Sequence, residues 1–142
     1  PTLAEEVEIL ERRRGRTEDH ETLRAVTDAA EIQQMKMTIE NVVVDEDVER
    51  YMVSLVQATR SAHQLAVGAS PRASLALLKL SRIRAAMKAR GFVVPDDVKD
   101  VVPDVLVHRL ILKPDMWGTG HSARSVTESI LSTVEVPKVG VS

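Results

Sequence analysis

Three residues in the middle of the chain have the types and spacing that suit the binding of an anion. Ser70, Pro71 and Arg72 follow a glycine-containing loop and open an apolar stretch. Serine is a favoured N-cap because its hydroxyl can accept from an unpaired backbone N–H, and proline suits the first helical position. Arg72 would then be a cation in the first turn, where the helix dipole favours negative charge. We expect an anionic group in front of this helix.

The other residue types that could do chemistry form no recognisable site. The histidines share no helical i, i+4 spacing and the chain has no cysteine, so we expect no metal site. These histidines are His20, His63, His108 and His121. The glycine-rich patterns G-x-x-x-x-G-K-[ST] and G-x-G-x-x-G are absent from the sequence, and no nucleophile elbow marks a serine. We therefore expect this chain by itself to be catalytically silent.

Composition is that of a globular protein and limits the classes of partner. The 142 residues are 44% hydrophobic and 28% charged, with a formal net charge of −2 and a pI of about 6.1. The acidic balance and the scarcity of aromatic residues disfavour binding to nucleic acid. Lack of cysteine is compatible with a reducing compartment, and the sequence has neither a signal-peptide pattern nor an apolar run of membrane-spanning length. We expect a cytoplasmic protein that binds no membrane.

Helical periodicity predicts the elements that must position Ser70–Arg72. The clearest helix follows Asp45 as N-cap, and its apolar face obeys the i, i+3, i+4 rule. That face consists of Val48, Tyr51, Met52, Leu55, Val56 and Thr59. A central helix is expected from Pro71 to Arg90, with Gly91 as its C′ residue. Its expected buried face is Leu75, Leu78, Ile83, Ala86 and Met87.

Further helices are expected on either side of this pair. One begins at Thr2 and ends at Gly15, and a second covers 29–40, opened by Asp28 and Glu31 as a capping box. The second is expected to bury Ile32, Met35 and Ile39. Short helices are expected at Pro95 and at Pro103, the latter carrying Val105, Leu106 and Leu110, and a last one over 123–133 is expected to bury Val126, Ile130 and Leu131.

The connections between these helices lack strand periodicity. Residues 42–44 and 92–94 are expected to be extended, and 113–122 to be a loop. Because no stretch alternates with period two over strand length, the predicted fold class is all-α, a small helical bundle.

Several stretches, in order, resemble the C-terminal lid of the MoxR-type AAA+ ATPases. They are "YMVSLVQATR" at 51–60, "VGASPRASLALLKLSRIRAAMKARGFVVPDDV" at 67–98 and "PDVLVHRLIL" at 103–112. "PTLAEEVEILERR" at 1–13 resembles the segment that enters that lid from the nucleotide-binding core, and the terminal "ILSTVEVP" fits the family's chain end. The resemblance is weakest over 14–40 and 113–125. Val94 departs from the family, where a threonine N-cap is common, and magnesium-chelatase ATPase subunits have a similar lid with a similar Ser-Pro-Arg.

The resemblance implies an AAA+ lid domain over 1–142 and a role for its arginine. Residues 1–14 would be a connector helix from a missing nucleotide-binding core, 15–112 the lid helices, and 113–142 a C-terminal loop and helix. Arg72 would be the sensor-2 residue, which contacts the γ-phosphate of ATP bound with Mg²⁺ on the core, beside Ser70 and Pro71. Arg60 is either a second nucleotide contact or a helix-end cation. The pair His108-Arg109 is expected to anchor the last helices by hydrogen bonds.

At the level of the whole protein, the resemblance implies an ATPase of which this chain is one part. Pro1 in place of methionine predicts a longer protein, with the Walker motifs and arginine finger outside these residues. That parent would be an ATP-driven chaperone or remodelling ring, a hexamer, that matures partners with von Willebrand A domains, and the lid alone would hold no cofactor. The alternatives are a stand-alone helical adaptor that binds proteins, a magnesium-chelatase-type lid, and a DNA-binding helical module.

Overall fold

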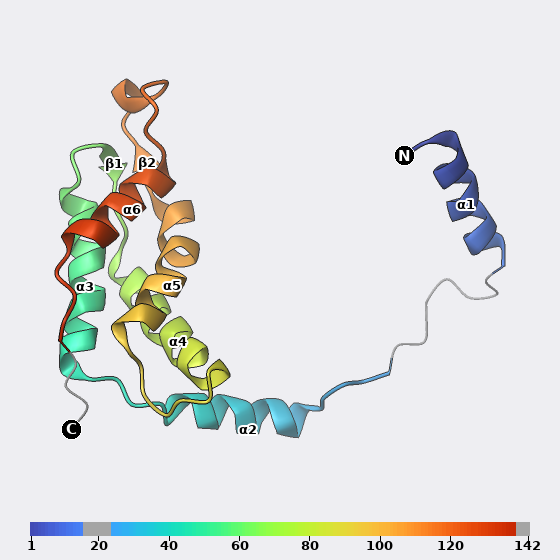
Figure 1. The fold of residues 1–142 in the computed structure, drawn as a ribbon, viewed down its shortest axis with the longest axis horizontal. Coiled ribbons are helices and arrows are strands. Elements are labelled where there is room, and N and C mark those ends of the chain that lie inside the picture. The colour runs from blue at the N-terminus through green and yellow to red at the C-terminus, as the bar shows by residue number, and fades with distance from the viewer. Residues whose placement is uncertain (16–23, 139–142) are drawn as a thin grey trace. The chain divides into compact units, whose positions relative to one another are not determined.

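Helices predominate in the computed structural model, which describes residues 1–15 and 24–138 (Figure 1). The chain divides into two units, residues 1–32 and residues from 33 onward. The α-helices are α1 (Leu3–Arg14), α2 (Ala29–Glu40), α3 (Glu46–Ser61), α4 (Pro71–Met87), α5 (Pro95–Leu106) and α6 (Ala123–Thr133). None of the helices in the described ranges combines the length and apolar character that a membrane span requires. The predicted all-α fold class is confirmed.

The first unit contains α1, which begins and ends where the sequence predicts. Thr2 and Glu5 form a capping box, in which the Glu5 carboxylate accepts the Thr2 N–H at 2.7 Å. Three arginines occupy the last turn and Gly15 follows as the cap. No residue of α1 is buried.

Helix α2 forms where it is predicted, but its predicted burial is wrong. The Asp28 carboxylate accepts the Glu31 N–H at 2.8 Å, as the capping box requires. Ile32 is 41% and Met35 is 57% exposed, and only Ile39, near the C-terminal end, is half-buried. Periodicity defines an apolar face, but burial also needs a second surface to cover that face.

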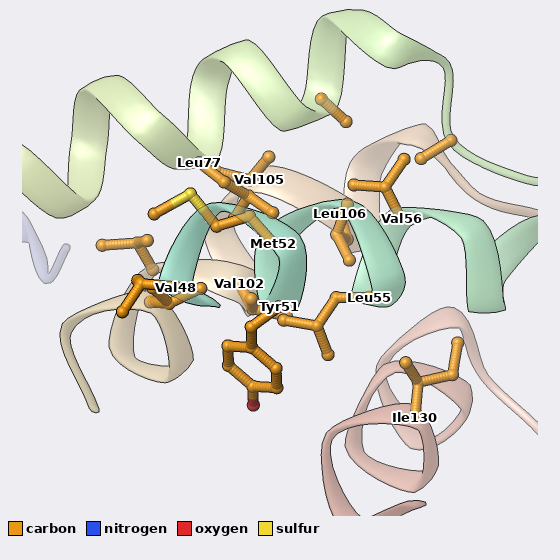
Figure 2. Close-up of a cluster of buried hydrophobic side chains, with 14 of the residues drawn as sticks. Val48, Tyr51, Met52, Leu55, Val56, Leu77, Val102, Val105, Leu106 and Ile130 are labelled. Carbon is orange, nitrogen blue, oxygen red and sulfur yellow. The ribbon is translucent and has the colours of Figure 1, made fainter. Parts of the chain in front are cut away.

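The second unit has its core where α3, α4, α5 and α6 meet (Figure 2). Every residue predicted on the apolar face of α3, from Val48 to Thr59, is buried. Helix α6 packs against α3 and α5 and begins and ends as predicted. Val126 and Ile130 of α6 are buried and Leu131 is half-buried, so this face is also confirmed.

Helix α4 buries a different face from the predicted one. Its buried residues are Ala73, Leu77, Ser81 and Ala85, one every fourth position. Leu75 and Met87, predicted to be buried, are 61% and 75% exposed, while Leu78, Ile83 and Ala86 are half-buried. Small side chains along this row let neighbouring helices approach α4 closely, so the seam follows them rather than the bulkiest residues.

Helix α4 also ends earlier than predicted. The last helical residue is Met87, and Ala89 rather than Gly91 adopts a left-handed conformation, with φ of 55°. The Arg90 N–H donates to the Ala85 carbonyl at 3.0 Å and the Ala89 N–H donates to the Ala86 carbonyl at 2.9 Å. These two bonds form a Schellman motif with a non-glycine residue at C′.

Helix α5 is continuous, although the sequence predicts separate helices at Pro95 and Pro103. Pro103 lies inside the helix, on which a single buried stripe runs from Val98 to Leu106. Burial of that stripe on both sides of Pro103 offsets the backbone bond that proline removes. Leu110 is buried but lies beyond the helix.

Short elements complete the second unit. The extended segments at 42–44 and 92–94 meet in a parallel bridge between Val43 and Phe92. Strands β1 (Leu65–Val67) and β2 (Ile111–Leu112) pair antiparallel and are too short to show a period of two. Two single 3-10 turns flank β2: η1 (Val107–Arg109) precedes it, and η2 (Pro114–Met116) follows it within the predicted loop at 113–122.

Candidate functional site

The candidate site lies where the end of α3 meets the start of α4. The connecting chain returns through β1 and passes against the last turn of α3 at Gly68. A Cβ atom at Gly68 would lie 2.7 Å from the Cα and N atoms of Arg60 and from the Thr59 carbonyl oxygen. All three are backbone atoms, so only glycine fits this crossing without a shift of the chain.

Thr59 holds the connecting chain in this position. Its side chain is fully buried. The Thr59 hydroxyl donates to the Val56 carbonyl at 2.6 Å and accepts the Ala69 N–H at 2.9 Å. Since Ala69 is itself 1% exposed, this bond satisfies a backbone donor that water does not reach.

Ser70, Pro71 and Arg72 open α4 as the sequence predicts, with one difference. Ser70 is the N-cap, extended at φ −81° and ψ 167°, and Pro71 is in the first turn. The Ser70 side chain makes no capping hydrogen bond, so the predicted role of its hydroxyl is wrong. The Ser70 carbonyl instead accepts the Ala73 N–H at 2.8 Å, which leaves the hydroxyl exposed beside the helix N-terminus.

Arg72 and Arg60 are both exposed at this junction. Within residues 1–15 and 24–138, neither side chain has a hydrogen bond or an ion pair. The first turn of α4 holds no acidic residue, so no side chain there neutralises the positive end of the helix. The junction therefore has two exposed guanidinium groups and a helix start without a side-chain cap, and each of these features suits phosphate oxygens.

A second cluster of charged residues, around Asp97, stabilises the fold. Burial opposes ionisation of Asp97, yet hydrogen bonds from Arg90, the Val94 N–H and Lys88 hold the pKa of this carboxyl below its usual value. Val94 cannot cap α5 with its own side chain, and the Asp97 carboxylate binds the N-cap N–H instead. This cluster ties the end of α4 to the start of α5.

The pair His108-Arg109 makes local bonds at the end of α5. Arg109 donates to the Val105 carbonyl, and its Nη1 lies 2.5 Å from Nε2 of His108. These contacts hold η1 on the helix before it and do not join separate helices. In the described ranges, no group of three histidine or acidic side chains could hold a metal ion, and His20 lies outside them.

Two residues of the site were not singled out from the sequence. Thr59 was expected only as part of a buried face, and Gly68 only as part of a loop. A threonine on an otherwise apolar stripe is a usable signal, because a buried hydroxyl needs a partner. The partner of that hydroxyl, ten residues away at Ala69, follows only from the tertiary fold.

Known proteins resemble this chain over most of its length. The family model described as the AAA lid domain matches residues 57–130. YeaC of Bacillus subtilis, which is uncharacterised, is 32% identical over 137 residues, 96% of this chain and 42% of that protein. The chaperone MoxR1 of Mycobacterium tuberculosis is 42% identical over 98 residues, 63% of this chain and 26% of that protein.

One solved structure extends this likeness to the fold. The crystal structure of a candidate ATPase from Cytophaga hutchinsonii superposes with a TM-score of 0.78 at 27% sequence identity. That match covers 96% of this chain and 44% of the other. The chain thus spans less than half the length of each of these relatives.

Proposed function

Because the chain belongs to the AAA lid domain family, we propose that it is the C-terminal lid of a MoxR-type AAA+ ATPase and that Arg72 acts as its sensor-2 residue. The observation that carries this proposal is the exposed Arg72 guanidinium at the uncapped start of α4, without a partner in the described chain. In the proposed lid, the Arg72 guanidinium is available to contact nucleotide that is bound on the core.

An arginine at this position is unfavourable in the free lid and would be favourable beside a polyphosphate. In the free lid, the guanidinium faces the positive end of α4, which is unfavourable by at most about 1 kcal/mol. A bound polyphosphate would reverse the sign of that interaction. The planar guanidinium would then donate to phosphate oxygens, while Ser70 and Arg60 offer further donors nearby.

We propose the following division of roles along the chain. Residues 1–14 connect to a nucleotide-binding core, residues 15–112 form the lid, and 113–142 close it at the C-terminal end. The core would hold ATP and Mg²⁺, which would neutralise charge on the transferring phosphoryl group. Arg72 would add a donor to the same charge when the lid closes. The parent would act as a remodelling ring with neighbouring copies, in keeping with the name of MoxR1 as a chaperone.

The test replaces Arg72 in the longer ATPase that carries this lid. Arg72→Ala should lower ATP turnover at saturating ATP by on the order of 100-fold, because a donor to the developing charge is lost. The melting temperature should hardly change, because Arg72 is exposed.

Arg124 offers a matched control, since it is the second residue of α6 after a serine N-cap, as Arg72 is of α4. Arg124→Ala should leave turnover at the wild-type level. Equal turnover for Arg72→Ala and wild type would remove Arg72 from the active site. A large fall in its melting temperature would make it a structural residue.

A further inference from the structure

We infer that Thr59 and Gly68 are positioning residues, which set the direction in which Arg72 meets nucleotide; this rests on the function proposed above. The Thr59 side chain is fully buried and Gly68 has no side chain, so neither residue offers nucleotide a side-chain contact. Their effect would pass through the backbone of residues 68–70, which the close crossing at Gly68 and the Thr59 hydroxyl bond hold against α3.

The Thr59 hydroxyl uses both its donor and an acceptor position in this contact. Donation to the Val56 carbonyl at 2.6 Å fixes the rotation of the hydroxyl, and its lone pair then points to the Ala69 N–H at 2.9 Å. The bond is buried on both sides, since Thr59 and Ala69 are 0% and 1% exposed. Without it, the Ala69 N–H would lose its partner away from water, and the chain would move to find another.

Arg72 lies between two anchored residues. Ala69, three positions before it, is held by Thr59, and Ala73, one position after it, is fully buried in the core. The Arg72 backbone is thereby held on both sides while its side chain stays exposed. Loss of the first anchor leaves only Ala73, and the start of α4 can then fray or tilt.

Gly68 makes the first anchor possible. Any side chain at this position would meet the backbone of Thr59 and Arg60 at 2.7 Å, and backbone cannot swing away as a flexible side chain can. The crossing also keeps Arg60 beside the segment that leads to Arg72. Displacement of the guanidinium by about 1 Å is enough to lower a rate by around 100-fold when a reacting group depends on it.

The first experiment measures turnover in the longer ATPase. Thr59→Val keeps the shape of the side chain and removes the hydroxyl, and should lower kcat by about 10-fold to 100-fold. Thr59→Ser keeps the hydroxyl and should retain turnover close to that of wild type. Thr127→Val is the matched control, because Thr127 is also fully buried but its hydroxyl donates to Ala123 within α6. Thr127→Val should turn over ATP normally.

A double-mutant cycle separates positioning from general damage to the fold. If Thr59 acts through Arg72, then Thr59→Val should lower turnover no further in a protein that already carries Arg72→Ala. An additional loss of the same size in that background would overturn the inference.

Amide hydrogen exchange in this chain tests the geometry without ATP. Thr59→Val should raise the exchange rate of the Ala69 amide by at least about 10-fold, since its acceptor is lost. Unchanged protection of Ala69 would overturn the inference, whatever the turnover. Faster exchange at Ala69 with normal turnover of Arg72→Ala would instead contradict the proposed function and leave the anchor in place as a structural contact.

Discussion

Asp97, buried at the start of α5, is paired with Arg90 just beyond the end of α4, with 2.5 Å between Oδ1 and Nη2. The same carboxylate accepts from Nζ of Lys88 at 3.0 Å and from the Val94 N–H at 3.1 Å. The ionised form of Asp97 therefore has three donors, and this cluster connects the two helices that pack most extensively against each other.

The first prediction is a loss of stability in acid. The pKa of Asp97 is below its unfolded value. The pKa of Asp100 is also lowered, mainly because Lys88 and Arg84 donate hydrogen bonds to the Asp100 carboxylate. A lowered folded pKa contributes stability that is present above the unfolded pKa and is lost as pH falls through the folded value. The free energy of unfolding should therefore decline below about pH 4.

Asp97→Asn tests whether the Asp97 carboxyl causes this loss of stability in acid. It should lower the free energy of unfolding by about 1–3 kcal/mol at neutral pH, because a neutral amide replaces the buried carboxylate that pairs with Arg90 and Lys88, and it should flatten the acid dependence. Asp104→Asn is the control, since Asp104 is exposed on α5 and has no ion pair within the described ranges. Urea unfolding at several pH values provides the measurement. An unchanged pH profile for Asp97→Asn would contradict this assignment.

The second prediction concerns the left-handed residue after α4. Ala89→Gly should stabilise the protein by roughly 0.5–1 kcal/mol, because glycine adopts the φ of 55° without a Cβ clash. Gly91→Ala is the matched change in the other direction. Gly91 has no atom within 4 Å of an added Cβ and no positive φ, so alanine should be tolerated there. Thermal melts of both variants decide the matter, and destabilisation by Ala89→Gly would be the contrary result.

The third prediction distinguishes the two candidate faces of α4. Leu77 is fully buried, so Leu77→Ala should cost about 2–5 kcal/mol of unfolding free energy. Leu78, on the face expected from the sequence, is only half-buried, so Leu78→Ala should lower the free energy of unfolding by less than Leu77→Ala does. Chemical denaturation of both variants gives the order, and a larger loss for Leu78→Ala would mean that the buried seam of α4 lies elsewhere.

The fourth prediction compares two serine N-caps. The Ser122 hydroxyl accepts the Ser125 N–H at 3.0 Å, so Ser122→Ala should destabilise the protein by about 0.5–2 kcal/mol. The Ser70 side chain makes no such bond, so Ser70→Ala should leave stability nearly unchanged. In the longer ATPase, the same Ser70 change should lower turnover if the hydroxyl donates to nucleotide. A large loss of stability for Ser70→Ala would show that the hydroxyl caps α4 in solution.

Features governed by local chemistry could be predicted from the sequence. Capping side chains at Thr2, Asp28 and Asp45 and the proline at 71 mark helix starts, because their effects act within one turn of backbone. The buried face of α3 could also be predicted, since its apolar residues lie on one side and its polar residues on the other. Arg72 was found in the same way, from a charge that disagrees with its local helix dipole.

Features that depend on distant parts of the chain were decided by the tertiary structure alone. Helix α4 has apolar residues around much of its surface, so periodicity cannot choose among its faces, and close packing selects the row of Ala73, Leu77, Ser81 and Ala85. The Thr59–Ala69 bond likewise joins residues ten positions apart through a crossing that only Gly68 permits. Rules based on local sequence predict neither the buried row of α4 nor the Thr59–Ala69 bond, because both depend on how closely two backbones approach after the core has formed.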